Sequence, residues 1–232
     1  MYAERILQIV IKLAAARSDP GLETRFGVEK HQFRLRPPMP ESQLLAFERE
    51  HNVVLPDDYR RFLLLAGDGG AGPFYGIEPL SDWDRWFEEE AESPGFLASP
   101  CPLIDSVAVR QAWKAAQMRD ARRAKGVVHV GASPSQAWEA LLPSEWPEWG
   151  KGSINLCDQG CTYSARLIVS GEARGRIVYL DSQGWYPPYF VRDPNFIEWY
   201  QRRLETSVSG GPDGWFGFDN PEYPSYLDLV SE

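Results

Sequence analysis

The residue types that most often carry chemistry are sparse in this chain, and their spacing favours no reaction. The three histidines, His31, His51 and His129, lie far apart, and none is placed as a ligand pair or as the base of a nucleophile. Acidic residues are abundant, but acid–base catalysis needs two carboxyl groups in different environments across a cleft, which a solvated acidic run does not indicate. The sequence supports no reaction class, and we expect no catalytic residues.

Two further motifs look like ligand sites at first sight. Cys157 and Cys161 are separated by three residues, which could set two thiolates around a metal, but no second cysteine or histidine pair completes such a site. A turn between strands with one small thiol at each end is the favoured interpretation. The glycine-rich segment 67–73 follows an expected helix and precedes an expected strand, the reverse of a phosphate-binding loop, and it lacks the lysine. We therefore expect neither a metal nor a cofactor.

Composition excludes several classes of partner. The 24 basic and 33 acidic residues give a net charge of −9, so nucleic acid and anionic membrane surfaces should be repelled. With 43% hydrophobic residues in 232, the chain should fold around a real core. Three cysteines cannot all pair, which fits a reducing compartment, and residues 1–16 are too polar for an export signal. We expect a cytoplasmic protein with no membrane span.

Helices dominate the first third of the chain. Ile6, Val10, Leu13 and Ala14 recur at helical spacing, which predicts an amphipathic helix over residues 1–16. A second helix is expected from 40 to 51, and a third begins at the Leu-Pro-Asp-Asp segment 55–58, where proline and acidic residues suit a first helical turn. Four glycines and Pro73 then end it.

Short apolar segments separated by glycine turns follow later. Residues 74–80 read as a short strand, 81–92 as an acidic aromatic helix and 107–124 as a basic helix. Segments 154–156, 163–169 and 176–180 predict an antiparallel meander, and 195–208 predicts a closing helix. The fold class is therefore α+β, with N-terminal helices and a C-terminal helix flanking a curved, mainly antiparallel sheet. We expect one domain over 1–208 and an irregular tail over 209–232 rich in Pro, Gly and aromatics.

The clearest surface feature is the segment 81–92. It carries six acidic residues and one basic residue around Trp83, Trp86 and Phe87. Aromatic anchors ringed by one sign of charge suit recognition of a basic protein, in which the aromatics supply affinity and the acids a faster encounter. The alternative is an amphipathic helix whose aromatics are core and whose acids are merely solvated. Trp138, Trp146 and Trp149 raise the same question, since they could stack on sugars, cover a partner or cap the core.

Three segments together resemble the SUKH superfamily of Smi/Knr-like proteins, which includes many bacterial immunity proteins. The first runs from Ser42 through the Leu-Pro-Asp-Asp-Tyr turn to Leu63, and the second is the glycine turn and Pro-Phe-Tyr-Gly-Ile run from Gly69 to Leu80. The third comprises Gln159-Gly160-Cys161, the segments 167–171 and 175–177, and the helix around Trp199. Each is weakly specific alone, but their order matches over about 160 residues. Residues 81–150 contain a stretch that matches no family motif and reads as a variable insertion.

The resemblance implies an α+β fold and a binding protein that is not an enzyme, most often one that neutralises a toxin by covering its active face. Such a toxin could be a basic nuclease or deaminase. The partner surface is predicted at Asp82, Trp83, Asp84, Trp86, Glu88 and Glu89, with Trp146 and Trp149 as a weaker second patch. A regulatory protein-interaction adaptor and a carbohydrate-binding protein remain as alternatives. Family-matching positions such as Tyr59, Gly72 and Trp199 are expected to be scaffold.

Overall fold

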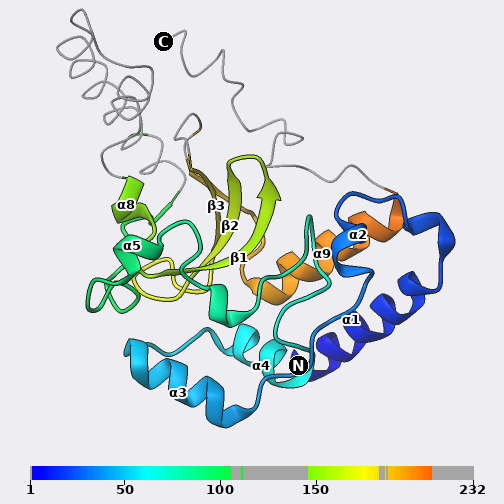
Figure 1. The fold of residues 1–232 in the computed structure, drawn as a ribbon, viewed down its shortest axis with the longest axis horizontal. Coiled ribbons are helices and arrows are strands. Elements are labelled where there is room, and N and C mark those ends of the chain that lie inside the picture. Colours follow the sequence, from blue (N-terminus) through cyan, green and yellow to red (C-terminus); the bar gives the residue numbers. More distant parts are fainter. Residues whose placement is uncertain (1, 106–110, 112–145, 183–185, 187, 211–232) are drawn as a thin grey trace, which may run out of the picture.

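A computed structural model describes residues 2–105, 111, 146–182, 186 and 188–210. The N-terminal part is helical, and the later part holds a sheet followed by one long helix (Figure 1). The helices are α1 (Tyr2–Arg17), α2 (Val28–His31), α3 (Glu41–His51), α4 (Asp57–Leu65), α5 (Glu88–Ala91), α8 (Trp146–Trp149) and α9 (Phe196–Ser209), with 3-10 turns η1 (Pro20–Leu22) and η2 (Leu80–Asp82).

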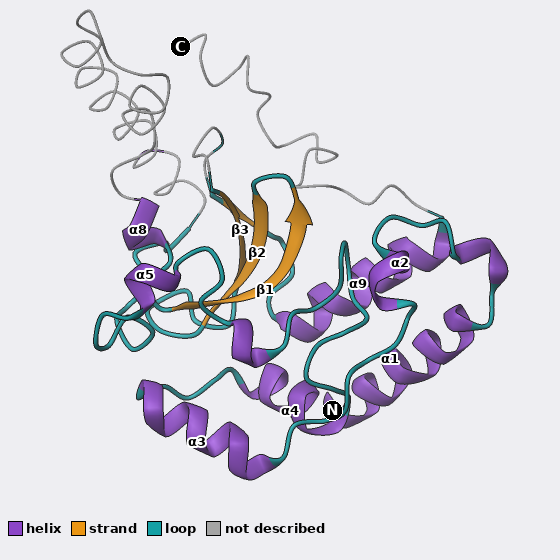
Figure 2. Ribbon diagram, viewed as in Figure 1, coloured by secondary structure: helices purple, strands orange, loops and turns teal. Residues whose placement is uncertain are grey.

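Four strands form one antiparallel sheet in the order β1-β2-β3-β4. They are β1 (Ser153–Gly160), β2 (Tyr163–Ile168), β3 (Ile177–Asp181) and β4 (Tyr189–Phe190). The turn between β1 and β2 is tight because Gly160 and Cys161 both adopt positive φ, at 95° and 53°. The strands curve across the middle of the molecule, with α9 on one side and α5 and α8 towards the other (Figure 2).

One face of the sheet is apolar and packs against α9. Trp199 is fully buried, and its Nε1–H donates to the hydroxyl of Tyr179 on β3 at 2.9 Å. Tyr59 and Phe62 of α4 meet Phe196 edge to face, with ring centroids 4.8 and 5.0 Å apart. These rings form the centre of the core, because α9 lies between the sheet and α4 and contacts α1 as well.

The ends of α9 and α4 are fixed by polar contacts. The Asn195 side chain accepts the Glu198 amide at 3.0 Å and so caps the start of α9, while Gly210 at φ 79° ends the helix. The Asp58 carboxylate in the first turn of α4 accepts the Ile197 amide at 3.1 Å. Burial raises the pKa of Asp58, and backbone amides including Ile197 oppose that rise. One carboxylate therefore serves two helix N-termini.

The α+β class and the antiparallel meander expected from the sequence are confirmed. The structure differs over residues 74–92, where the expected strand and helix form only in part. Gly70 and Ile77 make an isolated antiparallel bridge, and the acidic segment contains only η2 and the short α5. The expected basic helix at 107–124 and the tail after 210 lie outside the described residues, apart from residue 111.

Candidate protein-interaction surface

The segment 81–92 turns its largest rings into the molecule. Trp83 is only 8% exposed and meets His51 at 4.8 Å, Phe47 at 6.3 Å and Phe96 at 6.4 Å between ring centroids. Phe87 is fully buried. Trp86 is half-buried at φ 76°, and its indole N–H has no hydrogen-bond partner among the described residues. Trp83 and Phe87 thus attach the segment to the core and do not project from it as free anchors.

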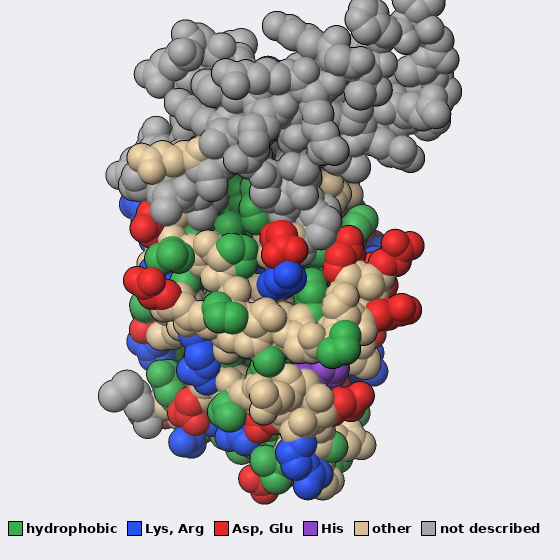
Figure 3. All heavy atoms as spheres, turned by 90° about the vertical axis from the view of Figure 1, so that its left-hand side faces the viewer, with side chains coloured by type: hydrophobic (Ala, Val, Ile, Leu, Met, Phe, Trp, Pro, Cys, Tyr) green, Lys and Arg blue, Asp and Glu red, His purple; other side chains and the backbone are tan. Residues whose placement is uncertain are grey.

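The acidic side chains of the segment are more accessible than its rings. Glu88 and Glu89 are exposed, and Asp82 and Asp84 are half-buried. Figure 3 looks at the side on which α3 and α5 lie in Figure 1, and acidic side chains stand at several separate places on it. The predicted partner surface therefore presents carboxylates around a half-buried indole.

The second predicted patch is described only in part. Trp146 begins α8, with its side chain outside the described part of the structure, whereas Trp149 at the end of α8 is buried. An ideal Cβ on the adjacent Gly150 would stand 2.6 Å from the Phe87 ring, so the chain leaves α8 in close contact with that ring. Trp149 is core in this structure and is not placed to stack on a sugar. Trp138 and His129 lie outside the described residues.

A buried arginine holds the acidic segment to the sheet. Arg166 lies in the middle of β2 with no exposed surface, and its Nη1 donates to the Arg85 carbonyl at 3.0 Å. Nη2 donates to the carbonyls of Trp83 and Ser153 at 3.3 and 3.0 Å, and Nε donates to Ser153 Oγ at 2.9 Å. The guanidinium carbon also lies 4.7 Å from the Phe87 ring centroid. One side chain thus contacts three positions between 83 and 87.

The charged side chain of Arg166 is stabilised by hydrogen bonds and forms no ion pair with any described carboxylate. Burial lowers its pKa to about 9, against the raising effect of Cys101, Asp84 and Glu88. It remains protonated at neutral pH, because 9 is still well above 7. A buried cation is tolerated where its donors are directed at acceptors, and here three carbonyl oxygens and one hydroxyl accept four of the five N–H groups. The acids of the segment lie near a fixed positive charge beneath the surface.

A second basic residue connects the segment to its surroundings. Arg85 contacts Glu78 at 3.0 Å and Asp158 of β1 at 3.8 Å. Burial raises the pKa of Glu78, and Arg85 acts in the opposite direction. Because Arg85 contacts two acids, it offsets only part of the negative charge here, and Glu88 and Glu89 are free of ion pairs with the described residues. The surface remains acidic.

Neither described histidine is set up for catalysis. Nδ1 of His31 accepts the Phe33 amide at 3.0 Å, and burial lowers the pKa of His31 to about 4, against a raising effect of Glu29. Burial also lowers the pKa of His51, whose ring lies 4.4 Å from Phe47 between centroids. Both imidazoles are therefore neutral at pH 7 and packed against aromatic rings.

The cysteines lie in different environments. Burial raises the pKa of Cys101 to about 11 and also raises that of Cys157, while Cys161 is exposed. Within the described ranges no group of three or more His, Cys, Asp and Glu side chains could hold a metal ion. The helices of those same ranges include none that is long and apolar enough to cross a bilayer.

Sequence reasoning missed Arg166 as a determinant of this surface. A charged residue inside the apolar strand Tyr-Ser-Ala-Arg-Leu-Ile is the pattern that could have indicated it, because a central strand rarely buries an arginine without a specific set of acceptors. Asn155, directly opposite Arg166 on β1, was also missed. In the part of the chain that the structure describes, neither the nitrogen nor the oxygen of its buried side-chain amide has a hydrogen-bond partner.

Comparison with known proteins gives one match. Residues 38–202 match the model of the SMI1 / KNR4 family (SUKH-1), a span that runs from just before α3 into α9. No curated protein and no solved structure matches the chain. The matched span covers well over half of the 232 residues and includes the sheet, Arg166 and the acidic segment. The chain therefore belongs to the SMI1 / KNR4 family (SUKH-1).

Proposed function

We propose that this protein is an immunity protein that binds a toxin and neutralises it by covering the toxin's active face. Family membership supports a protein partner and a role that does not depend on catalysis. The toxin would be a basic enzyme such as a nuclease or a deaminase, because the chain carries a net charge of −9 and presents Glu88 and Glu89 outward.

The observation that carries this proposal is the rigid attachment of the acidic segment. Trp83 and Phe87 are in the core, and Arg166 donates to the carbonyls of Trp83 and Arg85, so the backbone that bears the acids is fixed before any partner arrives. A pre-organised surface loses little conformational entropy on binding. Fixed carboxylates also attract a basic partner over about one Debye length, about 8 Å at physiological ionic strength.

Co-expression tests the proposal directly. The toxin domain encoded beside this chain should arrest growth when produced alone, and the wild-type chain should restore growth. The double variant Glu88→Lys with Glu89→Lys should weaken binding of the purified toxin by about tenfold or more and reduce the salt dependence of the association rate. The matched control is Glu4→Lys with Glu172→Lys, which changes the net charge equally at two other exposed acids.

The control variant should bind the toxin to within about twofold of wild type, because it leaves the segment intact. Equal loss in both double variants would mean that only net charge matters, and no loss in either would place the partner elsewhere. A neighbouring reading frame without a toxin, together with binding to signalling proteins, would instead favour the adaptor alternative.

A further inference from the structure

Helix α1 carries a second apolar stripe on its outward side. Ile6, Ile9, Leu13 and Ala16 face the core, as an amphipathic helix requires. A further set points outward at i, i+3, i+4 and i+7 spacing, comprising Leu7, Val10, Ile11 and Ala14. Leu7 is 55% exposed and Ile11 is 52% exposed. A helix with two apolar stripes is typical of one that packs between two partners, and the described residues cover only one side of α1.

A groove lies beside this stripe, between α1 and the segment 33–38. It holds about 450 Å³ and is lined by Val10, Leu13, Ala14, Arg17, Phe33, Arg34, Leu35, Arg36, Pro37, Pro38 and Ala66. A second hollow of about 450 Å³ at the C-terminal end of α1 shares Arg17, Phe33 and Arg34 with it. The second hollow also contains Asp19, Glu23 and Glu29, so the name α1 groove is used here for the first hollow alone.

The charge of the α1 groove is opposite to that of the protein. Beside α1 its walls contain Arg17, Arg34 and Arg36 and no acidic residue. Arg17 and Arg34 form no ion pair with a described residue, whereas Arg36 interacts with Glu78. In a chain of net charge −9, three arginines around an apolar floor are a local exception.

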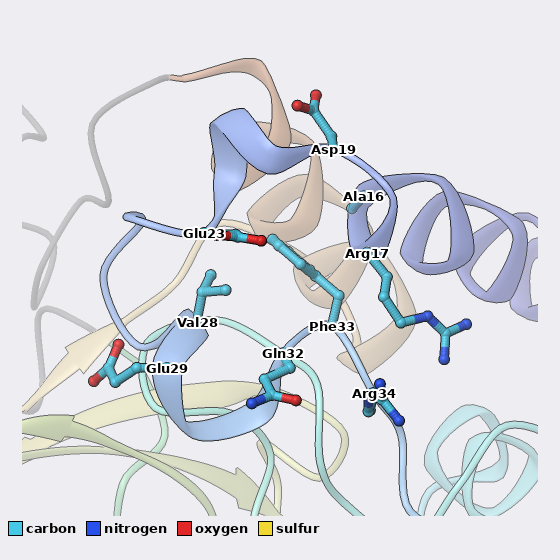
Figure 4. Close-up of a pocket in the computed structure, with 9 residues that line it drawn as sticks. All are labelled: Ala16, Arg17, Asp19, Glu23, Val28, Glu29, Gln32, Phe33 and Arg34. Atoms are coloured by element: carbon cyan, nitrogen blue, oxygen red, sulfur yellow. The ribbon is translucent and has the colours of Figure 1, made fainter.

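The close-up shows how the charged side chains lie at the C-terminal end of α1. Arg17 and Arg34 are on one side, the carboxylates of Asp19 and Glu29 point away from them, and Glu23 lies on the other side of Phe33 (Figure 4). The Asp19 carboxylate is already engaged by the Gly21 amide at 2.9 Å. The two guanidinium groups are therefore left available along the rim of an apolar surface.

We propose that the α1 groove binds an acidic amphipathic helix from a partner protein. The apolar stripe spans residues 7–14, about two turns or 10 Å of helix, which suits helix-in-groove recognition through anchors at i, i+3, i+4 and i+7. The arginines would pair with carboxylates flanking those anchors. No residue of the acidic segment 81–92 lines the groove, so this surface is separate from that segment and goes beyond the proposed function.

Two synthetic peptides test the proposal on the full chain. One is a fluorescein-labelled helix-forming peptide with leucine at i, i+3, i+4 and i+7 and glutamate at the flanking positions; its twin has lysine in place of each glutamate. Fluorescence anisotropy should show saturable binding of the glutamate peptide that weakens as salt is raised. Binding of the lysine twin should respond to Glu88→Lys and not to changes in the groove, so the two surfaces are tested independently.

Charge reversal and its control complete the experiment. Arg34→Glu should weaken binding of the glutamate peptide by about five- to tenfold, and Val10→Glu should do so through the apolar wall. Arg49→Glu, an equal charge change on exposed α3, should leave the affinity within about twofold. Far-ultraviolet circular dichroism identifies any variant that fails to fold, and Arg34, which is exposed, provides the variant least subject to that failure.

Three outcomes would overturn the proposal. The first is no saturable binding of the glutamate peptide to the wild-type chain. The second is equal weakening by Arg49→Glu and Arg34→Glu, which would indicate an effect of net charge. The third is self-association in sedimentation that Val10→Glu abolishes, because the occupant of the groove would then be a second copy of this chain. Loss of toxin binding in Glu88→Lys would leave the inference untouched.

Discussion

The two faces of the sheet solve the same packing problem with different chemistry. The face that carries Tyr179 is covered by the regular helix α9, and its contacts are aromatic. The opposite face carries Arg166, with Ser153 and Asn155 beside it on β1, and irregular chain from 83 to 87 covers it. A helix can cover a sheet with side chains alone, since its backbone groups are already paired. Irregular chain brings unpaired carbonyls, and a buried arginine satisfies them.

The difference predicts that the two faces fail in different ways. Loss of an aromatic residue should reduce the stability of the whole domain, because it opens a cavity in the shared core. Loss of the arginine should release one segment first, because two of its four hydrogen bonds join the carbonyls of Trp83 and Arg85 to the sheet.

The largest effect is expected from Trp199→Ala on the apolar face. Trp199 is fully buried, and a tryptophan-to-alanine change in a core lowers the free energy of unfolding by about 3–5 kcal/mol. Urea denaturation followed by circular dichroism measures it. Trp199→Phe is the control, since it keeps a ring and should lose less than half as much. If Trp199→Ala lowered the free energy of unfolding less than Arg166→Met does, the expected order of the two faces would be wrong.

Arg166→Met should lower the free energy of unfolding by about 2–3 kcal/mol, because methionine fills similar volume but leaves the carbonyls of Arg85 and Ser153 without this donor. Its distinctive effect should be local opening of the segment that Arg166 holds. The backbone amide of Asn155, which donates to the Trp83 carbonyl at 2.8 Å, should exchange with solvent faster than the loss of global stability explains. Native-state hydrogen exchange checks this.

The exposed Arg174 provides the control for that variant. Its side chain donates to the Val54 carbonyl near the surface, so Arg174→Met should cost below about 0.5 kcal/mol and leave Asn155 exchange unchanged. Uniform acceleration of all amides in Arg166→Met would argue that the polar face is no more independent than the apolar one.

A pH experiment separates the titration of His31 on α2 from the fixed charge of Arg166. The pKa of His31 is lowered to about 4 from an ordinary 6.5, so the unfolded chain binds more protons between those values. Stability contributed by neutral His31 is complete above about pH 6.5 and is lost as pH falls, by about 2 kcal/mol at pH 5. His31→Asn, which retains an acceptor for the Phe33 amide, should flatten the stability profile over this window. Arg166 stays protonated throughout, so Arg166→Met should keep the wild-type slope.

The smallest effect is expected from Tyr179→Phe. This change removes the acceptor of the buried Trp199 N–H while leaving the ring in place, which should cost about 1–2 kcal/mol. Chemical denaturation gives the size, and tryptophan fluorescence reports the altered indole environment. An unchanged free energy of unfolding would show that the apolar face depends on ring packing alone.

Periodicity was sufficient to predict the regular elements. The helix over residues 1–16 follows from residue spacing, but that spacing selected Val10 and Ala14, which are exposed, whereas the structure buries Ile9 and Ala16. The strands follow from short apolar segments between glycine turns, and the Pro56-Asp57-Asp58 start of α4 follows from helix-terminus chemistry. Each of these patterns is local, so a window of ten residues contains the information that determines it.

The acidic segment could not be predicted in the same way. Trp83 and Phe87 are four residues apart, which reads as one face of a helix, but Trp86 takes a left-handed conformation and the chain bends instead. This bend leaves the carbonyls of Trp83 and Arg85 without partners in a helix, and Arg166, about 80 residues later in the sequence, donates to both. A contact over that distance has no periodic signature, which is why the segment was expected to be more helical than it is.

The turn between β1 and β2 has a practical consequence for the experiments above. Cys161 stands exposed at its apex, while Cys101 and Cys157 are buried with thiol pKa values that burial raises. A maleimide reagent at neutral pH should therefore modify Cys161 alone in the folded protein. A fluorophore or a surface tether can be attached there without introducing a new cysteine, which leaves both Glu88 and the α1 groove unmodified for binding measurements.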